Sequence, residues 1–66
     1  MTIFLNNEPH AISAETTIMQ LIEKQEISTR GLAVAINNTV IPKAQWSNKT
    51  LDENDRLTLI KATQGG

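Results

Sequence analysis

The chain opens with a short, mostly apolar segment. Residues 1–5 are rich in β-forming side chains that would alternate between the two faces of a strand, and residues 6–9 (Asn-Asn-Glu-Pro) are typical of a turn. Residues 10–13 can return beside the first segment as a second strand. The opening of the chain therefore predicts an N-terminal β-hairpin.

The spacing of apolar residues then changes to that of a helix. Ile18, Leu21 and Ile22 fall on one helical stripe. Thr17 precedes the stripe and Gln20 stands three positions later, which is the arrangement of a capping box. In such a box the threonine hydroxyl accepts from a backbone N–H and the glutamine reaches back. We expect a helix that begins after Thr17 and runs to about residue 25 or 26.

A second hairpin follows the helix. Leu32–Ile36 is a continuous apolar segment, as expected for a buried strand. The asparagine pair at residues 37–38 suits a tight turn because asparagine tolerates positive φ. Val40–Ile41 then forms a short return strand, which Pro42 ends because proline has no backbone N–H to donate.

The last part of the chain combines an irregular segment with one more strand. Residues 42–48 predict an irregular or single-turn segment that folds Trp46 against the body of the protein. Residues 52–55 are polar and typical of a turn, and Arg56–Lys61 reads as a strand. The predicted order is thus hairpin, helix, hairpin, turn and strand.

This order predicts an α+β fold in which one face of a sheet packs on a single helix. If the last strand lies beside the first, it runs parallel to it in the middle of a mixed sheet of about five strands. That is the β-grasp architecture. We expect it to occupy residues 1–61 as one domain, with residues 62–66 as a flexible C-terminal tail.

Successive side chains of a strand point to opposite faces of the sheet, which assigns the strand residues to two faces. The residues expected to face the helix are Met1, Ile3, Leu5, Leu32, Val34, Ile36, Leu57 and Leu59. The residues expected on the outer face are Phe4, Ala33, Ala35, Thr58 and Ile60. An exposed Phe4 beside an exposed Ile60 can mark a partner surface, although single apolar residues on a surface are also normal.

Length and charge narrow the classes of function. A chain of 66 residues has room for one domain and little interior for an enzyme pocket. A net charge of -1 gives no basic footprint for nucleic acid or for an acidic membrane. No apolar run approaches the ~20 residues that cross a bilayer. We expect a cytoplasmic protein without nucleic-acid or membrane binding.

Conventional catalytic and metal-binding sets are missing from the sequence. The chain has no cysteine and one histidine, so it offers neither a Cys/His pair nor a histidine cluster for zinc. His10 is expected to be a surface residue, and Asp52, Glu53 and Asp55 lack the spacing of an EF-hand. No glycine-rich phosphate loop occurs. The body of the protein is therefore not expected to be an enzyme or to hold a metal.

The composition changes at the end of the chain. Gly65 and Gly66 follow the last predicted strand after only Ala62, Thr63 and Gln64, so they would project beyond the fold. Glycine has no Cβ and can pass through a narrow channel. A partner enzyme could then reach the carboxylate of Gly66 without meeting side chains. The alternative is that these residues are simply a frayed terminus.

Together these features resemble the sulfur carriers of thiamine biosynthesis, the ThiS family of ubiquitin-like proteins. The resemblance covers essentially the whole chain. It rests on Ile3–Asn6, Thr17–Ile18, Val34–Asn37, Val40–Pro42, Trp46, Leu51–Asp52, Asp55 and Gly65–Gly66. The run from Ala35 to Trp46 is the most diagnostic part. One departure is Asn54, where the family often has glycine, and asparagine is the next best residue at positive φ.

The resemblance implies that partner enzymes act on this chain. An E1-like adenylyltransferase (ThiF type) would use ATP to turn the Gly66 carboxylate into an acyl-adenylate. Sulfur from a donor such as a cysteine desulfurase persulfide would displace AMP, and the Gly66 thiocarboxylate would deliver that sulfur to thiazole synthase (ThiG type). ATP is consumed by the partner, and no cofactor is bound permanently.

The resemblance also implies roles for individual residues. Gly66 would carry the sulfur, Gly65 would give access, and residues 62–64 would form the tether. The outer sheet face near Phe4 and Ile60, with Thr58 and Ala35, would help to dock the activating enzyme.

Three other interpretations of the sequence stay open at this point. The first is the sister sulfur carrier of molybdopterin synthesis, although the Trp46 segment argues against it. The second is a ubiquitin-like modifier that forms isopeptide bonds through Gly66. The third is a β-grasp interaction domain whose Gly-Gly end is incidental.

Overall fold

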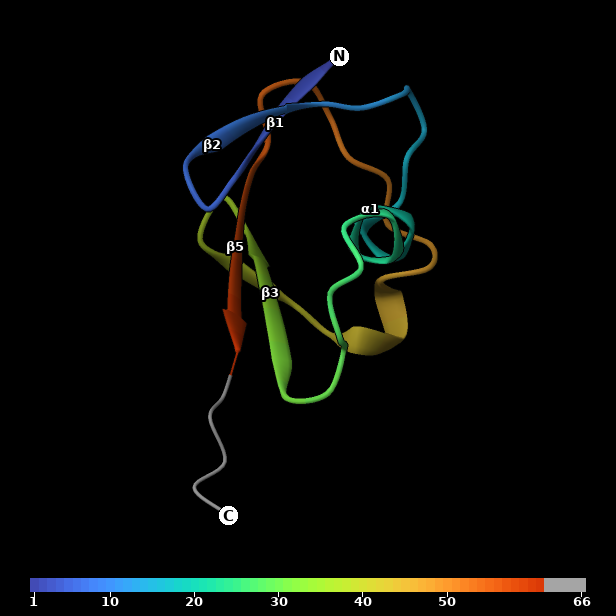
Figure 1. Cartoon of the computed structure of the whole chain (residues 1–66), viewed down its shortest axis with the longest axis vertical. Coiled ribbons are helices and arrows are strands. Elements are labelled where there is room, and N and C mark those ends of the chain that lie inside the picture. Colours follow the sequence, from blue (N-terminus) through green and yellow to red (C-terminus); the bar gives the residue numbers. More distant parts are fainter. Residues whose placement is uncertain (62–66) are drawn as a thin grey trace.

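The last strand of the sequence lies in the middle of the sheet. The computed structural model describes residues 1–61, and its five strands follow the order β2-β1-β5-β3-β4 (Figure 1). β5 runs parallel to β1 and antiparallel to β3, while β1–β2 and β3–β4 are antiparallel hairpins. The helix packs on one face of this mixed sheet. The predicted α+β, β-grasp architecture is confirmed.

The elements follow one another in the predicted order. They are β1 (Thr2–Leu5), β2 (Glu8–Ala11), α1 (Ile18–Lys24), β3 (Leu32–Ile36), β4 (Thr39–Ile41), the short 3-10 helix η1 (Lys43–Gln45) and β5 (Arg56–Lys61). No helix in residues 1–61 combines the length and apolar character of a membrane-crossing segment.

Both hairpins turn at a pair of asparagines in the left-handed region. Asn6 and Asn7 have φ of 48° and 71°, and Asn37 and Asn38 have φ of 50° and 72°. Two such residues match the right-handed twist of the flanking strands. The first turn therefore needs only two residues, and the prediction of a longer turn followed by a strand at residues 10–13 is wrong. Pro9 instead lies inside β2, where an edge strand tolerates its missing N–H.

The capping box begins α1 as predicted. The Gln20 backbone N–H donates to Thr17 Oγ1 at 3.1 Å, and the Thr17 backbone N–H donates to Gln20 Oε1 at 2.9 Å. The helix ends within two residues of the predicted position. Glu26 there takes a φ of 57°, and the Ile27 N–H donates to the Ile22 carbonyl at 3.2 Å. This is a Schellman-type end built on a residue other than glycine.

The core lies between α1 and the helix-facing side of the sheet. It contains Ile3, Leu5, Ile12, Ile18, Leu21, Ile22, Val34, Ile36, Trp46, Leu51 and Leu57. Leu32 and Leu59 are half-buried and pack against its border. The prediction for Met1 is wrong, because this side chain is 37% exposed. Met1 precedes β1, its ammonium group donates to the Ile12 carbonyl at 2.9 Å, and Ile12 enters the core instead.

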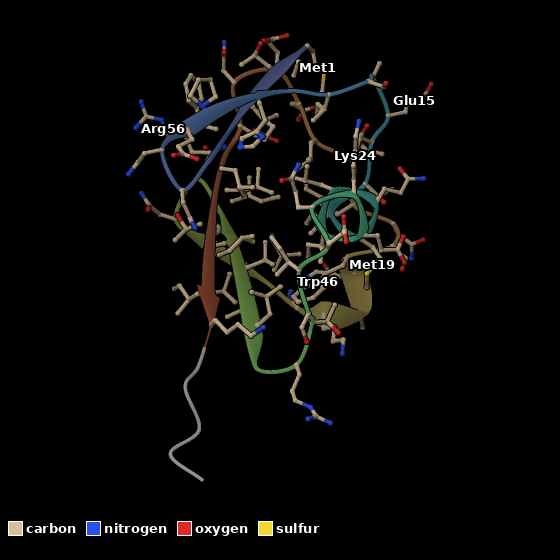
Figure 2. The ribbon with its side chains drawn as sticks, in the orientation of Figure 1. Met1, Glu15, Met19, Lys24, Trp46 and Arg56 are labelled. Atoms are coloured by element: carbon tan, nitrogen blue, oxygen red, sulfur yellow. The ribbon has the colours of Figure 1, made fainter. Side chains whose placement is uncertain are left out.

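Trp46 is held inside the core by contacts on two sides. Its ring is 1% exposed, and its Nε1–H donates to the Ile41 carbonyl at 2.9 Å. The Met19 N–H donates to the Trp46 carbonyl at 3.0 Å, which joins this segment to α1 (Figure 2). The predicted folding of Trp46 against the body is therefore confirmed.

Candidate functional site

The strand that leads to the predicted sulfur-carrying residue is paired on both sides. β5 forms a five-pair register with β3, from Leu32 opposite Lys61 to Ile36 opposite Leu57, and a shorter parallel register with β1. It ends at Lys61. The predicted site residues Ala62, Thr63, Gln64, Gly65 and Gly66 lie outside the residues that the structure describes.

The four residues predicted to dock a partner share the sheet face that points away from α1. Ala35 lies opposite Thr58, Ile60 lies two pairs further along the same strands, and Phe4 belongs to β1 at the level of Arg56. The structure thus brings the predicted docking residues to one face. We call this face, with residues 4, 33, 35, 40, 56, 58 and 60, the outer face.

The exposed apolar part of the outer face differs from the prediction. Phe4 is half-buried beside Pro9 on the edge strand, so the expected pair of exposed Phe4 and Ile60 is wrong. Phe4 lies level with Arg56, and Ile60 is four residues further along β5, which is about 13 Å. Ile60 is 57% exposed. The other large apolar side chain exposed on the outer face is Val40, which is 69% exposed.

Val40 is a residue of the outer face that the sequence analysis missed. It lies opposite Ala35 on β4, and Ala35 is buried between Val40 and Thr58 in adjacent strands. Small alanines on β3 therefore separate the larger Val40 and Ile60. The asparagine pair at 37–38 could have revealed this, because a two-residue turn fixes the register of β4.

A buried hydrogen-bond network fastens the second hairpin turn to the beginning of β5. Asp55 is 9% exposed, and its carboxylate accepts from Asn37 Nδ2 at 3.3 Å and from the Asp52 N–H at 2.8 Å. Asn37 Oδ1 accepts from the Arg56 N–H at 3.1 Å, and the Asn37 N–H donates to the Arg56 carbonyl at 2.8 Å. Asp55 thus has a structural role rather than the solvated one that a polar turn predicts.

The first hairpin turn is fastened to β5 in a similar way. The Asn6 N–H donates to the Leu57 carbonyl at 2.9 Å, and Asn6 Oδ1 accepts from the Leu59 N–H at 2.9 Å. Both asparagine turns therefore hold the first half of β5. Because these contacts are between backbone and short side chains, the geometry of this end of the sheet is well defined.

An open depression of about 360 Å³ lies between the two turns. Its lining residues are Asn7, Asn37, Asn38, Arg56, Leu57 and Thr58. Arg56 projects away from α1 in Figure 2, on the outer-face side of the sheet. This depression was not predicted from the sequence, because its residues come from three separate segments.

The described residues offer little conventional chemistry. Among residues 1–61, no group of three or more His, Cys, Asp or Glu side chains is arranged to hold a metal ion. His10 is half-buried rather than at the open surface, since it lies opposite Ile3 on β2. The described part of the chain is thus a scaffold with a defined outer face and a polar depression.

Comparisons with known proteins agree with this scaffold. Residues 3–66 match the ThiS family. The chain is 29% identical over 66 residues to the sulfur carrier protein ThiS of Escherichia coli K12, and the match covers all of both chains. It is 26% identical over 66 residues to a thiazole synthase of Paramagnetospirillum magneticum, of which it covers 20%.

A solved structure supports the fold. The crystal structure of a thiamine biosynthesis protein (ThiS) from Geobacter metallireducens superposes with a TM-score of 0.86, at 16% identity and over the full length of both chains.

Proposed function

The chain belongs to the ThiS family of sulfur carriers in thiamine biosynthesis, and we propose that its sulfur is carried as a thiocarboxylate on Gly66. As a member of this family it is a carrier protein rather than an enzyme. The family match runs through residue 66, and this supports placing the cargo at the last residue.

The proposed chemistry follows from the weak reactivity of a carboxylate. Attack of the Gly66 carboxylate on ATP releases pyrophosphate and gives an acyl-adenylate, in which AMP is a good leaving group. The terminal sulfur of a persulfide then attacks the acyl carbon and expels AMP. A second thiol cleaves the resulting S–S bond, which leaves the thiocarboxylate at Gly66. A thioacid is ionised at neutral pH and presents a nucleophilic sulfur.

The observation that carries the proposal is the position of β5. It is the central strand, it is bonded on both sides, and it ends at Lys61, five residues before Gly66. Five residues span at most about 18 Å. We propose that residues 62–64 form a tether and Gly65 gives access, so the partner's active site must come within that distance of Lys61.

Three partners fit this chemistry. An adenylyltransferase of the ThiF type supplies the activation, and a persulfide donor such as a cysteine desulfurase supplies the sulfur. The recipient we propose is a thiazole synthase, and the match of this chain to one fifth of such an enzyme from P. magneticum supports it. The outer face around Ile60 is the proposed docking surface for the adenylyltransferase. Its ATP-dependent chemistry fits a cytoplasmic location, which cell fractionation tests.

Two variants at the end of the chain test the proposal. Deleting Gly66, or adding one alanine after it, should abolish pyrophosphate release and thiazole formation, because the acyl carbon is lost or displaced. Both variants should keep the thermal unfolding curve of the parent chain, since β5 ends at Lys61. Thiazole formation by the chain without Gly66 would refute the proposal.

A further inference from the structure

The depression between the two hairpin turns has the composition of an oxyanion site. Its lining residues supply one guanidinium, three asparagine amides and a threonine hydroxyl, and include no Asp or Glu. The Asn37 side chain is already engaged by Asp55 and the Arg56 N–H. Within residues 1–61, no hydrogen bond engages the side chains of Asn7, Asn38, Thr58 or Arg56. The depression therefore holds donors that can turn toward a ligand.

The depression is built before any ligand arrives. Its walls are the two asparagine turns, and each turn is hydrogen-bonded to β5. Arg56 stands between these walls, where its planar fork of N–H donors matches the two oxygens of a carboxylate. Because these walls are already fixed, the backbone around the depression loses little conformational freedom on binding.

The depression is also part of the outer face. Arg56 and Thr58 belong to both, and they lie on the same side of β5 as Ile60. Arg56 and Lys61 mark the two ends of β5, about 17 Å apart. A protein that covers the outer face and takes up the end of the chain therefore also reaches the depression.

We infer that this depression binds a carboxylate side chain of the adenylyltransferase that docks on the outer face. The inference rests on the docking surface given above and adds a specific polar contact to it. A contact at each end of β5 would fix the direction of the sheet on the partner. Arg56 would act as a positioning residue that holds the docked sheet in this direction.

Two features favour a carboxylate from a protein over a free phosphate. Arg56 is the one charged residue among those that line the depression, so a doubly charged anion would lack a second cation. Glu8 lies on β2, which β1 separates from β5, and the chain carries a net charge of -1. The negative charge of Glu8 and the net negative charge of the chain both oppose the binding of free anions. A carboxylate on a docked protein meets less opposition, because the other contacts of the interface already hold it near the depression.

The test measures KM and kcat for pyrophosphate release with the full chain as substrate. Arg56→Gln should raise KM about tenfold with kcat nearly unchanged, and Arg56→Lys should recover only part of the loss. Lys24→Gln is the matched control, since it removes the same charge from an exposed residue on α1. Its KM should change less than about twofold. Raising NaCl to about 0.5 M should reduce the difference between Arg56→Gln and the parent chain.

A second variant keeps the test valid if Arg56→Gln unfolds. Asn38→Gly removes one amide and preserves the turn, because glycine accepts the φ of 72° at this position. It should raise KM about threefold in the parent chain and less in the Arg56→Gln background, since both changes weaken one contact. Thermal unfolding curves check that each variant folds.

Several results would overturn the inference. Equal effects of Arg56→Gln and Lys24→Gln would indicate net charge alone, and a loss confined to kcat would exclude a binding contact. Saturation of the Arg56 guanidinium NMR signal by inorganic phosphate or acetate at about 1 mM would indicate a site for small anions. If Arg56→Gln has no effect while deletion of Gly66 still abolishes adenylation, the inference fails and the proposed function stands.

Discussion

Replacement of Trp46 tests whether this side chain is structural or functional. The ring is 1% exposed, and its Nε1–H donates to the Ile41 carbonyl. Truncating a fully buried tryptophan to alanine typically costs about 3–5 kcal/mol. A chain of 66 residues has a total stability of only about 3–10 kcal/mol. Trp46→Ala should therefore remove at least about a third of the stability of the chain, and all of it if the total lies at the lower end of this range.

The contacts of Trp46 explain why its replacement lowers the free energy of unfolding. Trp46 connects β4 to α1, because it bonds to Ile41 through its ring and to Met19 through its carbonyl. Trp46→Phe keeps most of the buried ring and loses the Nε1 donor. It should cost about 1–2 kcal/mol and should leave sulfur transfer intact at low temperature.

Urea unfolding followed by far-UV circular dichroism measures both variants without tryptophan fluorescence. With a slope of about 1 kcal/mol/M, Trp46→Ala should lower the midpoint by about 3 M or more, or remove the folded baseline. The phenylalanine variant should fall between that variant and the parent. An unchanged midpoint for Trp46→Ala would refute the burial argument. Loss of sulfur transfer in a fully folded Trp46→Phe chain would show that the residue has a functional role.

Three further substitutions test the account. Asp55→Ala should cost about 1–3 kcal/mol in urea unfolding, because Asn37 Nδ2 and the Asp52 N–H lose their acceptor; a neutral effect would contradict the network. Thr17→Ala should cost about 1 kcal/mol through loss of the helix cap, and Thr17→Ser should restore most of it. Ile60→Asp should raise the KM of the adenylyltransferase for the chain with little change in unfolding, since Ile60 is 57% exposed; an unchanged KM would exclude this part of the outer face from docking.

Local sequence signals predicted most of the fold. The capping box at Thr17, the asparagine turn before β4 and the alternation in β5 each fix backbone geometry within a few residues. Such signals depend only on residues that are close in sequence, so they can be interpreted without knowledge of the tertiary structure. The parallel pairing of β1 with β5 then followed from the order of the elements.

The errors arose where the tertiary position of a strand decides the outcome. Pro9 looked like a turn residue because the sequence does not reveal that β2 is an edge strand. Met1 continued the alternation of β1, but the core is completed by Ile12 instead. Phe4 lies on the outer face as the alternation predicted, but its neighbours on β2 and β5 leave it half-buried.

The polar depression could not be predicted for a related reason. It forms where two turns that are about 30 residues apart in sequence meet the same strand, and each turn by itself looked like an ordinary hairpin turn. The role of Asp55 was hidden in the same way, because its partner Asn37 lies 18 positions earlier. Such contacts appear only when the register of β5 is known.

The most direct test of the central claim is the mass of the C-terminal peptide. The chain is incubated with the adenylyltransferase, ATP and a persulfide donor, digested, and compared with a reaction without ATP. One oxygen of Gly66 should be replaced by sulfur, and the resulting increase in mass should depend on ATP and be confined to the peptide that contains Gly66. An unchanged Gly66 peptide, or sulfur located elsewhere in the chain, would contradict it.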